Sequence, residues 1–389
     1  MGRHIRRRFL PRAVLAAAVS FCARGVQGRD VPYEWNGVER VVAVGDVHGA
    51  YESFVAVLES AGLIDSRLQW IGGKAHLVQT GDVLDRGPDS RKVMDLLMDL
   101  EDQSENAGGR VHALIGNHEA MNVAGILDYV SPREFHSYTD ARSVGRRELA
   151  FRLHYQRLRK EASEVKAIPP SEEDARREFE SRVPLGYLEH RLAFSPRGKY
   201  GRWILSHNAA VRLDGTVFSH GDWSEAMSAM GIAEVNRRVR AELGGETPLD
   251  EGITFHPESP LQYRGISKLP LERDLQGGHR ERIDRILRNL EARRMVVGHT
   301  VTRGIIEPRF AGKHISIDTG MLELYDGGHR VALEIDEEGL RALHPRGAVS
   351  IPEDLSSRAL SLYLAAVTDV DPENRSLGRN LAAENDGPP

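Results

Sequence analysis

The sequence predicts an α/β fold whose functional side chains gather at the carboxyl ends of parallel strands. From residue 41 onward, short apolar runs alternate with stretches of helical period. Each of the first three runs meets a glycine, and an Asp or an Asn follows that glycine directly. Three strand–loop–helix units in succession are typical of an α/β sheet with its site at the carboxyl ends of the strands.

The first unit starts with the apolar run "VVAV" at residues 41–44 and continues through "GDVHG". Four apolar residues before a glycine predict a short buried strand. The following residues keep Phe54, Val57 and Leu58 on one helical face, so we expect a helix over residues 51–61. Asp46 and His48 therefore stand one residue apart in the turn, where both side chains can face one metal ion.

The second and third units repeat this pattern. "HLVQT" at residues 76–80 predicts a strand that runs into "GDVLDRGPDS", and the next helix is expected to begin near Pro88. "VHALI" at residues 111–115 predicts a strand that runs into "GNHEAMN". These two units add a further group of polar side chains at strand ends, namely Asp82, Asp85, Arg86, Asn117 and His118.

Residues 131–182 differ in character, because they are highly charged and helical in period, with a break at Pro169–Pro170. One interpretation is a solvated helical hairpin. The other is a cap over a cleft, since the segment stands between two groups of site residues. The sequence leaves both open.

Short strands return at "TVFSHGD", "RMVVGHT", "HISIDTGM" and "RVALEID", and helical periodicity returns in "RIDRILRNLEARR". The first two strands deliver His220 and His299. His207, in "LSHNAA", competes with His220 as a ligand. We prefer His220 because it repeats the order apolar run, His, Gly, and we interpret His207 as a structural or substrate-side histidine. Residues 350–389 are mostly polar, and we expect a loosely ordered tail.

The first thirty residues have the composition of a targeting leader. Seven arginines accompany a single acid, Asp30, and the apolar run "AVLAAAVSFCA" follows the basic cluster. This order is typical of a secretory signal peptide, so we expect export, in bacteria to the periplasm. An organelle transit peptide and a leader retained as a membrane anchor are the alternatives. Beyond residue 30, no apolar window is long enough to predict a membrane span.

The composition excludes several functions. Without the leader, the chain holds 45 basic and 56 acidic residues, a net charge of −11. A chain this acidic is a poor partner for nucleic-acid phosphates. Cys22, within the leader, is the only cysteine. The mature chain therefore offers no thiolate metal ligand and no cysteine nucleophile.

The side chains at the strand ends suit a two-metal hydrolytic centre. A pair of metal ions needs a bridging carboxylate and separate ligands for each ion, and it lowers the pKa of water so that hydroxide attacks phosphorus near neutral pH. A set of carboxylate, imidazole and amide ligands without sulfur suits two divalent ions of Mn, Fe or Zn better than copper or an iron–sulfur cluster. The predicted ligands are Asp82 as the bridge, Asp46 and His48 on one ion, and Asn117, His220 and His299 on the other.

The remaining polar residues have catalytic interpretations. His118 follows a predicted ligand directly, so its imidazole can protonate the leaving oxygen as a general acid. Asp85, three residues after Asp82, can hydrogen-bond His118 and keep it cationic. Arg86 can bind phosphate oxygens, and Arg264 in "LQYRG" is a second phosphate-binding candidate, with a surface arginine as the alternative.

The motifs "GDVHG", "GDVLDRG", "GNHE", "SHG" and "GHT", over residues 41–325, resemble the signatures of the metallophosphoesterase superfamily and of its phosphoprotein phosphatases. The variants "GDVLDRGP", "GNHEAMNVAG", "RRMVVGHTV" and "IDTGM" are similar to those of the Shewanella-like phosphatases. The resemblance implies a calcineurin-like fold over residues 36–345, in which two facing β-sheets are flanked by helices (αββα) and residues 131–182 form a helical insertion. It also implies hydrolysis of phosphomonoesters with Mn²⁺ or a similar ion.

Two departures from that family stand out. The family usually carries a second glycine after "HG", whereas this chain has Asp222, a carboxylate that we expect near the second metal ion, where it repels phosphate or tunes that ion. The stretch from Asn117 to His220 is longer than in the eukaryotic Ser/Thr phosphatases, so their substrate grooves cannot be carried over.

The sequence supports three functions in descending order. The first is a dinuclear metal-dependent phosphatase that acts on phosphoproteins or small phosphoesters, with Ser/Thr or Tyr preference and oligomeric state open. The second is a phosphohydrolase of diadenosine polyphosphates or other nucleotides. The third is an inactive metal-bound binding module, and the complete ligand set beside His118 and Arg86 argues against it.

Overall fold

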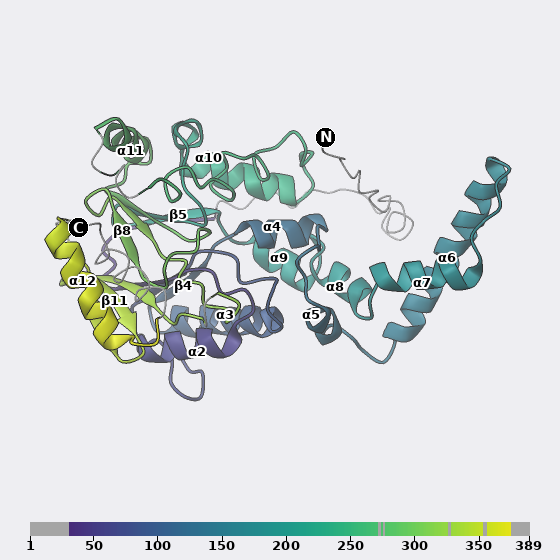
Figure 1. Cartoon of the computed structure of the whole chain (residues 1–389), viewed down its shortest axis with the longest axis horizontal. Helices are drawn as coiled ribbons and strands as arrows, with labels where there is room; N and C mark the ends of the chain where they lie inside the picture. The colour runs from purple at the N-terminus through teal and green to yellow at the C-terminus, as the bar shows by residue number, and fades with distance from the viewer. Residues whose placement is uncertain (1–30, 271–273, 275–276, 326–327, 353–355, 375–389) are drawn as a thin grey trace, which may run out of the picture. The chain divides into compact units, whose positions relative to one another are not determined.

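The computed structural model describes residues 31–270, 274, 277–325, 328–352 and 356–374 (Figure 1). The expected leader and residues 375–389 of the expected tail lie outside this part of the chain. The described residues divide into two compact units. One comprises residues 135–190, and the other comprises residues 31–134 together with 191–374.

The larger unit is built on two six-stranded sheets, and the first has the order β12-β11-β10-β2-β3-β4. Three of its strands are parallel and carry the apolar runs singled out in the sequence, and the other three are antiparallel. The parallel strands are β2 (Val41–Val44), β3 (His76–Gln79) and β4 (Arg110–Ala113). The antiparallel strands are β10 (Ala332–Asp336), β11 (Gly339–His344) and β12 (Gly347–Ser350).

The second sheet has the order β1-β5-β6-β7-β9-β8. Strands β6, β7 and β9 run parallel to one another, so their carboxyl ends point the same way. The strands of this sheet are β1 (Glu34–Trp35), β5 (Ala210–Leu213), β6 (Thr216–Ser219), β7 (Arg294–Val297), β8 (Glu307–Arg309) and β9 (His314–Ser316).

The hydrophobic core lies between the two sheets. Val41, Ala43 and Val78 from the first sheet belong to the same buried cluster as Phe218 and Ile315 from the second. Because helices also cover the outer faces, every residue of β2, β3 and β6 is buried. These strands therefore read as continuous apolar or uncharged runs rather than as alternating ones. The expected pair of facing sheets is confirmed.

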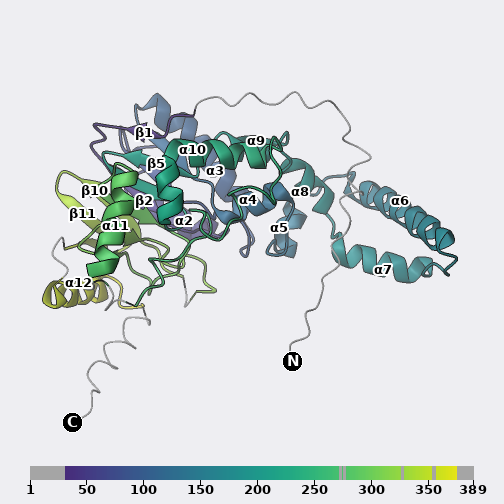
Figure 2. The same ribbon diagram turned by 90° about the horizontal axis from the view of Figure 1, so that it is seen from above.

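Helices cover the outer faces, which gives the expected αββα layers (Figures 1 and 2). Helices α2 (Tyr51–Ser60) and α3 (Ser90–Asn106) lie side by side on the first sheet, with Val93, Leu97 and Leu100 of α3 buried. The α3 helix begins two residues after Pro88, slightly later than expected. The second sheet is covered by α10 (Glu225–Leu243) and α11 (Gly277–Asn289). Helix α4 (Asn117–Ala124) contacts α10, and Tyr200 of α9 (Lys199–Leu205) donates to Asp95 of α3 at 2.9 Å.

The expectation of a loosely ordered tail from residue 350 is wrong for its first part. Residues Ser357–Val370 form a helix, α12, whose Tyr363 and Val367 are buried in the core between the sheets. The Tyr363 hydroxyl donates to the carbonyl of Ile306 at 2.8 Å. The apolar run "ALSLYLAAV" therefore forms part of an amphipathic helix. The mostly polar sequence around it made this helix difficult to predict.

The smaller unit is a helical hairpin with its own small core. Helices α6 (Ser143–Glu164) and α7 (Glu172–Arg182) pack through Phe151, Ala175, Phe179 and Val183. The break falls at Pro169–Pro170 as expected, and Ser171 caps α7 by accepting from the backbone N–H of Asp174. The hairpin is preceded by α5 (Pro132–Ser137) and followed by α8 (Tyr187–Ala193). Across the described residues of the whole chain, none of the helices has the length and apolar character of a membrane span.

Candidate metal centre

Parallel strand ends from both sheets meet at one edge of the sandwich, and each delivers a polar side chain there. Strands β2, β3 and β4 point the same way in the first sheet, as do β6, β7 and β9 in the second. The polar residues stand one to four positions beyond the last residue of each strand. In strand order they are Asp46, Asp82, Asn117, His220, His299 and Asp318.

The turns after these strands hold several site residues in the left-handed backbone region. The φ angle is 48° at His48, 56° at Asp82 and 64° at His299, and it is 70° at Asp85 and 66° at Arg86. Residues with a Cβ rarely adopt this conformation, which costs about 1–3 kcal/mol at each position. A cluster of such strained residues is typical of a functional site.

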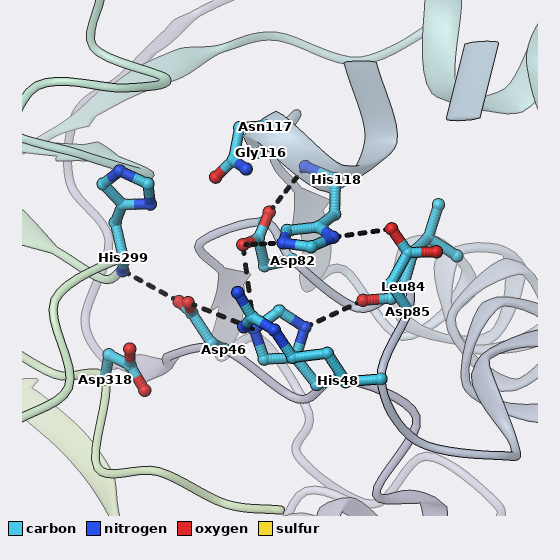
Figure 3. A network of polar contacts seen from close by, with 12 residues as sticks. Asp46, His48, Asp82, Leu84, Asp85, Gly116, Asn117, His118, His299 and Asp318 are labelled. Carbon is cyan, nitrogen blue, oxygen red and sulfur yellow. Dashed lines mark hydrogen bonds and ion pairs between the residues drawn. The ribbon is translucent and has the colours of Figure 1, made fainter. Parts of the chain in front are cut away.

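Asp82 lies at the centre of the cluster (Figure 3). Its Oδ2 atom is 3.3 Å from Nε2 of His220 and 3.8 Å from Nε2 of both His48 and His118. Two groups of ligand-type atoms share Asp82, and the atoms within each group lie within 4.8 Å of one another. His48 and His118 join Asp82 in one group, and His220 and His299 join it in the other. A carboxylate shared by two such groups is what a bridge between two metal ions requires.

Hydrogen bonds to backbone carbonyls orient two of the imidazoles. Nδ1–H of His48 donates to the carbonyl of Leu84 at 2.8 Å, and Nδ1–H of His220 donates to the carbonyl of Thr80 at 3.1 Å. In each ring the Nε2 lone pair then faces the cluster, which is the usual arrangement of a metal-binding histidine.

Asn117 and His220 provide a direct test of whether a cation fits here. Nε2 of His220 is 2.8 Å from Oδ1 of Asn117. Because Nδ1–H of His220 is donated to Thr80, this contact brings a nitrogen lone pair against an amide oxygen. Two acceptors at this distance need a proton or a cation between them. The donor set is oxygen and nitrogen without sulfur, so these residues fit a divalent metal ion.

The buried carboxylates also call for positive charge. Burial, together with the charges of Asp318 and Asp82, raises the pKa of Asp46 well above its usual range. Burial raises the pKa of Asp318 to about 6. Burial alone would raise the pKa of Asp82 too, but the imidazoles of His220 and His118 outweigh it and hold that pKa well below the usual value. Divalent ions would compensate this concentration of carboxylates.

Two imidazoles are held in the neutral form that binds metals. Burial lowers the pKa of His48 to about 3 and that of His299 to about 2, the latter with a contribution from the neighbouring His220. The backbone N–H of His299 also donates to Oδ1 of Asp46 at 2.9 Å, which joins the two sheets at the site. Neutral imidazole is the state that a metal ligand requires.

His118 differs from the other imidazoles because a carboxylate holds it. Its Nδ1 is 2.6 Å from Oδ2 of Asp85, and Oδ1 of Asp85 accepts from the side-chain amide of Asn122 at 3.0 Å. Burial lowers the pKa of His118, but the charge of Asp82 and the hydrogen bond to Asp85 outweigh it, and the net pKa is raised. The contact expected between His118 and Asp85 is therefore present, and Asn122 is a third member that the sequence reasoning missed.

Arg86 lies at the mouth of the site between two tyrosines. Its guanidinium carbon is 5.9 Å from the ring centroids of both Tyr129 and Tyr325, and its Nη1 contacts Nε2 of His48. Tyr129 is 51% exposed. Arg86 is thus at the site as expected, whereas neither tyrosine belongs to a motif that would have identified it.

Arg264 also reaches the site. Its Nη2 is 3.2 Å from Nδ1 of His299, so it is not the surface arginine of the alternative interpretation.

The expectation that Asp222 lies near the second metal ion and faces phosphate is wrong. Its carboxylate is buried against His314 and Ser267, with Oδ1 2.8 Å from Nε2 of His314, and its hydrogen bonds lie with those residues rather than with the metal ligands. The Asp222 carboxylate therefore makes its hydrogen bonds within the protein and does not face the phosphate.

Glu119, in the motif "GNHE", is a buried residue that the sequence reasoning left without a role. Its carboxylate accepts from the backbone N–H groups of Asp82 at 2.7 Å, Val83 at 3.0 Å and Gly116 at 2.8 Å. It therefore fixes the turn that carries Asp82. Burial and the charge of Asp82 raise the pKa of Glu119 to about 7.

His207 is not part of the cluster. Its Nε2 pairs with Oε1 of Glu101 at 2.8 Å, and its ring packs edge-on against Trp203. The preference for His220 over His207 as the site residue agrees with these contacts. Asp318 is a further residue that the sequence reasoning missed, although "IDTGM" had been noted as a motif.

Residues 39–303 match the calcineurin-like phosphoesterase family. The chain belongs to this family. The phosphoesterase is therefore a metal-dependent phosphoric ester hydrolase, as the motifs and the ligand-type clusters indicate.

The phosphoesterase is also similar to Shewanella-like protein phosphatases along most of its length. It is 31% identical over 308 residues to Shewanella-like protein phosphatase 2 of Arabidopsis thaliana, covering 76% of this chain and 75% of that protein. It is 25% identical over 317 residues to Shewanella-like protein phosphatase 1 of Plasmodium berghei, covering 80% and 75%.

Among solved structures, the phosphoesterase shares its fold with a cold-active protein-tyrosine phosphatase of a psychrophilic Shewanella species. The TM-score is 0.59 at 24% sequence identity, and the match covers 80% of this chain and 79% of that one. This likeness supports the two-sheet sandwich described above.

Proposed function

We propose that this phosphoesterase is a dinuclear phosphatase that hydrolyses phosphomonoesters of proteins. The observation that carries the proposal is the position of Asp82, which two ligand-type groups share, with the Asp85-bound imidazole of His118 beside it. The similarity to proteins named Shewanella-like protein phosphatases supports a phosphoprotein as the substrate.

In this proposal, Asp46, His48, Asp82, Asn117, His220 and His299 hold two divalent ions, with Mn²⁺ preferred. When bound, such ions polarise phosphoryl oxygens and lower the pKa of water so that it attacks phosphorus near neutral pH. The strained turns at His48, Asp82 and His299 fix the ligands before the substrate arrives, so the protein need not reorganise during the reaction.

His118 then serves as the general acid. Asp85 orients its ring, because the Nδ1–H bond leaves Nε2 directed at the centre of the site. A protonated Nε2 can pass its proton to the leaving oxygen, a contribution of about 10²–10⁴-fold in rate. The competing interpretation is that His118 is itself a ligand, since its Nε2 is as close to Asp82 as that of His48.

Arg86 and Arg264 bind the phosphate. Arg86 stands on the side of His48 and Arg264 on the side of His299, so the two guanidinium groups flank the ligand cluster. Tyr129 and Tyr325 line the approach to Arg86 with aromatic surface. This aromatic rim favours aryl phosphoesters, including phosphotyrosine, over alkyl ones.

The test begins with protein stripped by a chelator and reloaded with Mn²⁺. We expect Mn²⁺-dependent hydrolysis of a generic aryl phosphate, and absence of turnover after reloading would refute the enzymatic proposal. Phosphopeptides carrying phosphoserine, phosphothreonine or phosphotyrosine are then compared with diadenosine tetraphosphate. Faster cleavage of the nucleotide would replace the phosphoprotein proposal with the nucleotide phosphohydrolase alternative.

A further inference from the structure

Asp222 stands two residues after His220, yet it is 1% exposed, and its carboxylate makes its hydrogen bonds within the protein. Oδ1 accepts from Nε2–H of His314 at 2.8 Å and from the Ser267 hydroxyl at 2.7 Å. Oδ2 accepts from the backbone N–H groups of Ile266 and Ser267, both at 2.7 Å. A buried carboxylate with this many donors fixes the groups that donate to it, because each of them would be left unpaired without it.

The groups that Asp222 fixes lie on both sides of Arg264. The backbone N–H of Asp222 donates to the carbonyl of Tyr263 at 2.9 Å, on the N-terminal side of Arg264. Its carboxylate holds Ile266 and Ser267 on the C-terminal side. One residue therefore ties down the chain immediately before and after the arginine. Without these hydrogen bonds to Asp222, the loop that carries Arg264 would be free to move, and its long side chain would move out of the site.

Arg264 has donors to spare. Its Nη2 lies 3.2 Å from Nδ1 of His299, while its Nε is buried and has no hydrogen-bond partner among the described residues. The carbonyl of Gln262 accepts from Nε2–H of the same histidine at 3.0 Å, so the loop meets the site at two points. A half-buried guanidinium with an unused donor next to a candidate metal ligand is suited to bind an oxyanion.

We propose that Asp222 is a positioning residue that holds Arg264 in place to bind the substrate phosphate. The inference rests on the proposed function, in which Arg264 contacts that phosphate. Glycine, the residue usual at this place in the family that the motifs resemble, has no side chain with which to make these bonds. In this chain, the Asp222 carboxylate therefore fixes the loop of residues 260–267.

The experiment compares wild type with Asp222→Asn in the Mn²⁺-loaded full-length protein. Asparagine keeps the size of the side chain but replaces one acceptor oxygen with a donor. We expect KM for an aryl phosphate and Kd for inorganic phosphate to rise about tenfold, because the arginine fork is displaced, with a smaller change in kcat and unchanged Mn²⁺ content. Asp214→Asn is the matched control, since Asp214 likewise accepts two backbone N–H groups, from Gly37 and Val38, outside the site.

A double-mutant cycle identifies the route of the effect. In an Arg264→Ala background, Asp222→Asn should change Kd for phosphate by less than about twofold, because the group that it positions is gone. Independent effects that multiply, or loss of Mn²⁺ in Asp222→Asn, would overturn the inference and assign Asp222 to the support of His220. If Asp222→Asn does not fold, Ser267→Ala takes its place, with an expected rise of about two- to threefold that Arg264→Ala abolishes.

Phosphate binding also separates this inference from the proposed function, since Kd is measured without turnover. A wild type that binds phosphate in an Arg264-dependent way but hydrolyses no phosphoester would overturn the proposed function and leave the positioning role intact. A wild type that hydrolyses phosphoesters while Arg264→Ala leaves Kd unchanged would overturn the positioning role alone.

Discussion

Nδ1 of His118 and Oδ2 of Asp85 are 2.6 Å apart in a buried contact. Asn122 binds the other oxygen of Asp85, so the carboxylate cannot rotate away from the imidazole. The backbone N–H of His118 is also fixed, because it donates to Oδ1 of Asp82 at 2.9 Å. His118 is thus fixed through both its imidazole and its backbone beside the ligand cluster.

The first prediction concerns His118. Replacing it with alanine should lower kcat about 10²–10⁴-fold while the protein keeps its metal ions, because the general acid is lost and the ligands remain. Turnover and metal content are measured on the same preparation. Asp85→Asn should lower kcat less and leave metal content unchanged. Loss of metal from His118→Ala would make this residue a ligand and exclude it as the acid.

The second prediction concerns Glu119, which accepts from three backbone N–H groups around Asp82. Glu119→Gln replaces an acceptor by a donor, so we expect the free energy of unfolding to fall by about 3 kcal/mol in chelator and the Mn²⁺ affinity to fall with it. Glu242→Gln is the matched control, since Glu242 is buried and accepts from Ile253 and Thr254 away from the site. The control should lose stability without losing metal affinity, and equal loss of affinity in both would contradict a local role for Glu119.

Acid should destabilise the protein through a pair of buried histidines outside the site. Nε2 of His112 is 3.0 Å from Nδ1 of His76, and Trp35 packs edge-on against His112. Burial and the nearby Arg110 lower the pKa of His76 to about 4, and burial with the charge of His76 lowers the pKa of His112 well below its usual value.

The sign follows from proton binding. Unfolded histidines titrate near pH 6.5, so below that pH the unfolded chain binds protons that the folded chain excludes. Stability should therefore fall as the pH drops from about 6.5 to about 4. Urea midpoints at several pH values measure the slope. The double variant His76→Gln/His112→Gln should flatten it, while exposed His256→Gln should not, and an unchanged slope in the double variant would exclude this pair as the cause.

Helix α12 should contribute to global stability. Tyr363→Phe removes the hydrogen bond to Ile306 and should cost about 1 kcal/mol, and Tyr363→Ala should cost about 3–5 kcal/mol because it leaves a cavity. Leu362 is 63% exposed on the same helix, so Leu362→Ala is the control and should stay within about 0.5 kcal/mol of wild type. Equal effects at Leu362 and Tyr363 would show that α12 does not pack as described.

The hairpin of α6 and α7 tests whether residues 131–182 act as a cap. Nη2 of Arg147 and Oε1 of Glu180 are 3.6 Å apart, so the two helices are neighbours here and a flexible Gly-Ser linker is chosen to replace residues 148–179. We expect the ranking of phosphopeptide substrates to change while hydrolysis of a small aryl phosphate persists. An unchanged ranking would identify the hairpin as a solvated surface element.

The sequence pointed to residues that the folded chain brings together, because each strand and the polar residue after it are neighbours in the chain. The position of Asp46 after β2, or of His220 after β6, follows from local pattern alone. The direction of a side chain does not, and for this reason Asp222 was expected near a metal ion although its partners lie elsewhere. Tyr129 belongs to no strand-end motif, so only the folded chain brings it to Arg86.

Other parts of the fold were missed for different reasons. The tail reads as polar over residues 350–389, and the apolar face of α12 becomes evident only when the core offers a place for Tyr363. Strands β11 and β12 are short antiparallel additions to the sheet whose partners the sequence pattern does not identify. Glu119 resembles an ordinary helical glutamate until its backbone partners are known.

The pairing of β2 with β10 sets the order in which this chain can fold during synthesis. Val41 pairs with Ile335, so the first long strand to leave the ribosome lacks one neighbour until almost the whole chain has emerged. Contacts between such distant residues form slowly, because a long loop must close before they are made. Nascent chains that end before β10 therefore leave one edge of β2, a strand of four apolar residues, without its partner and present a target for chaperones and proteases.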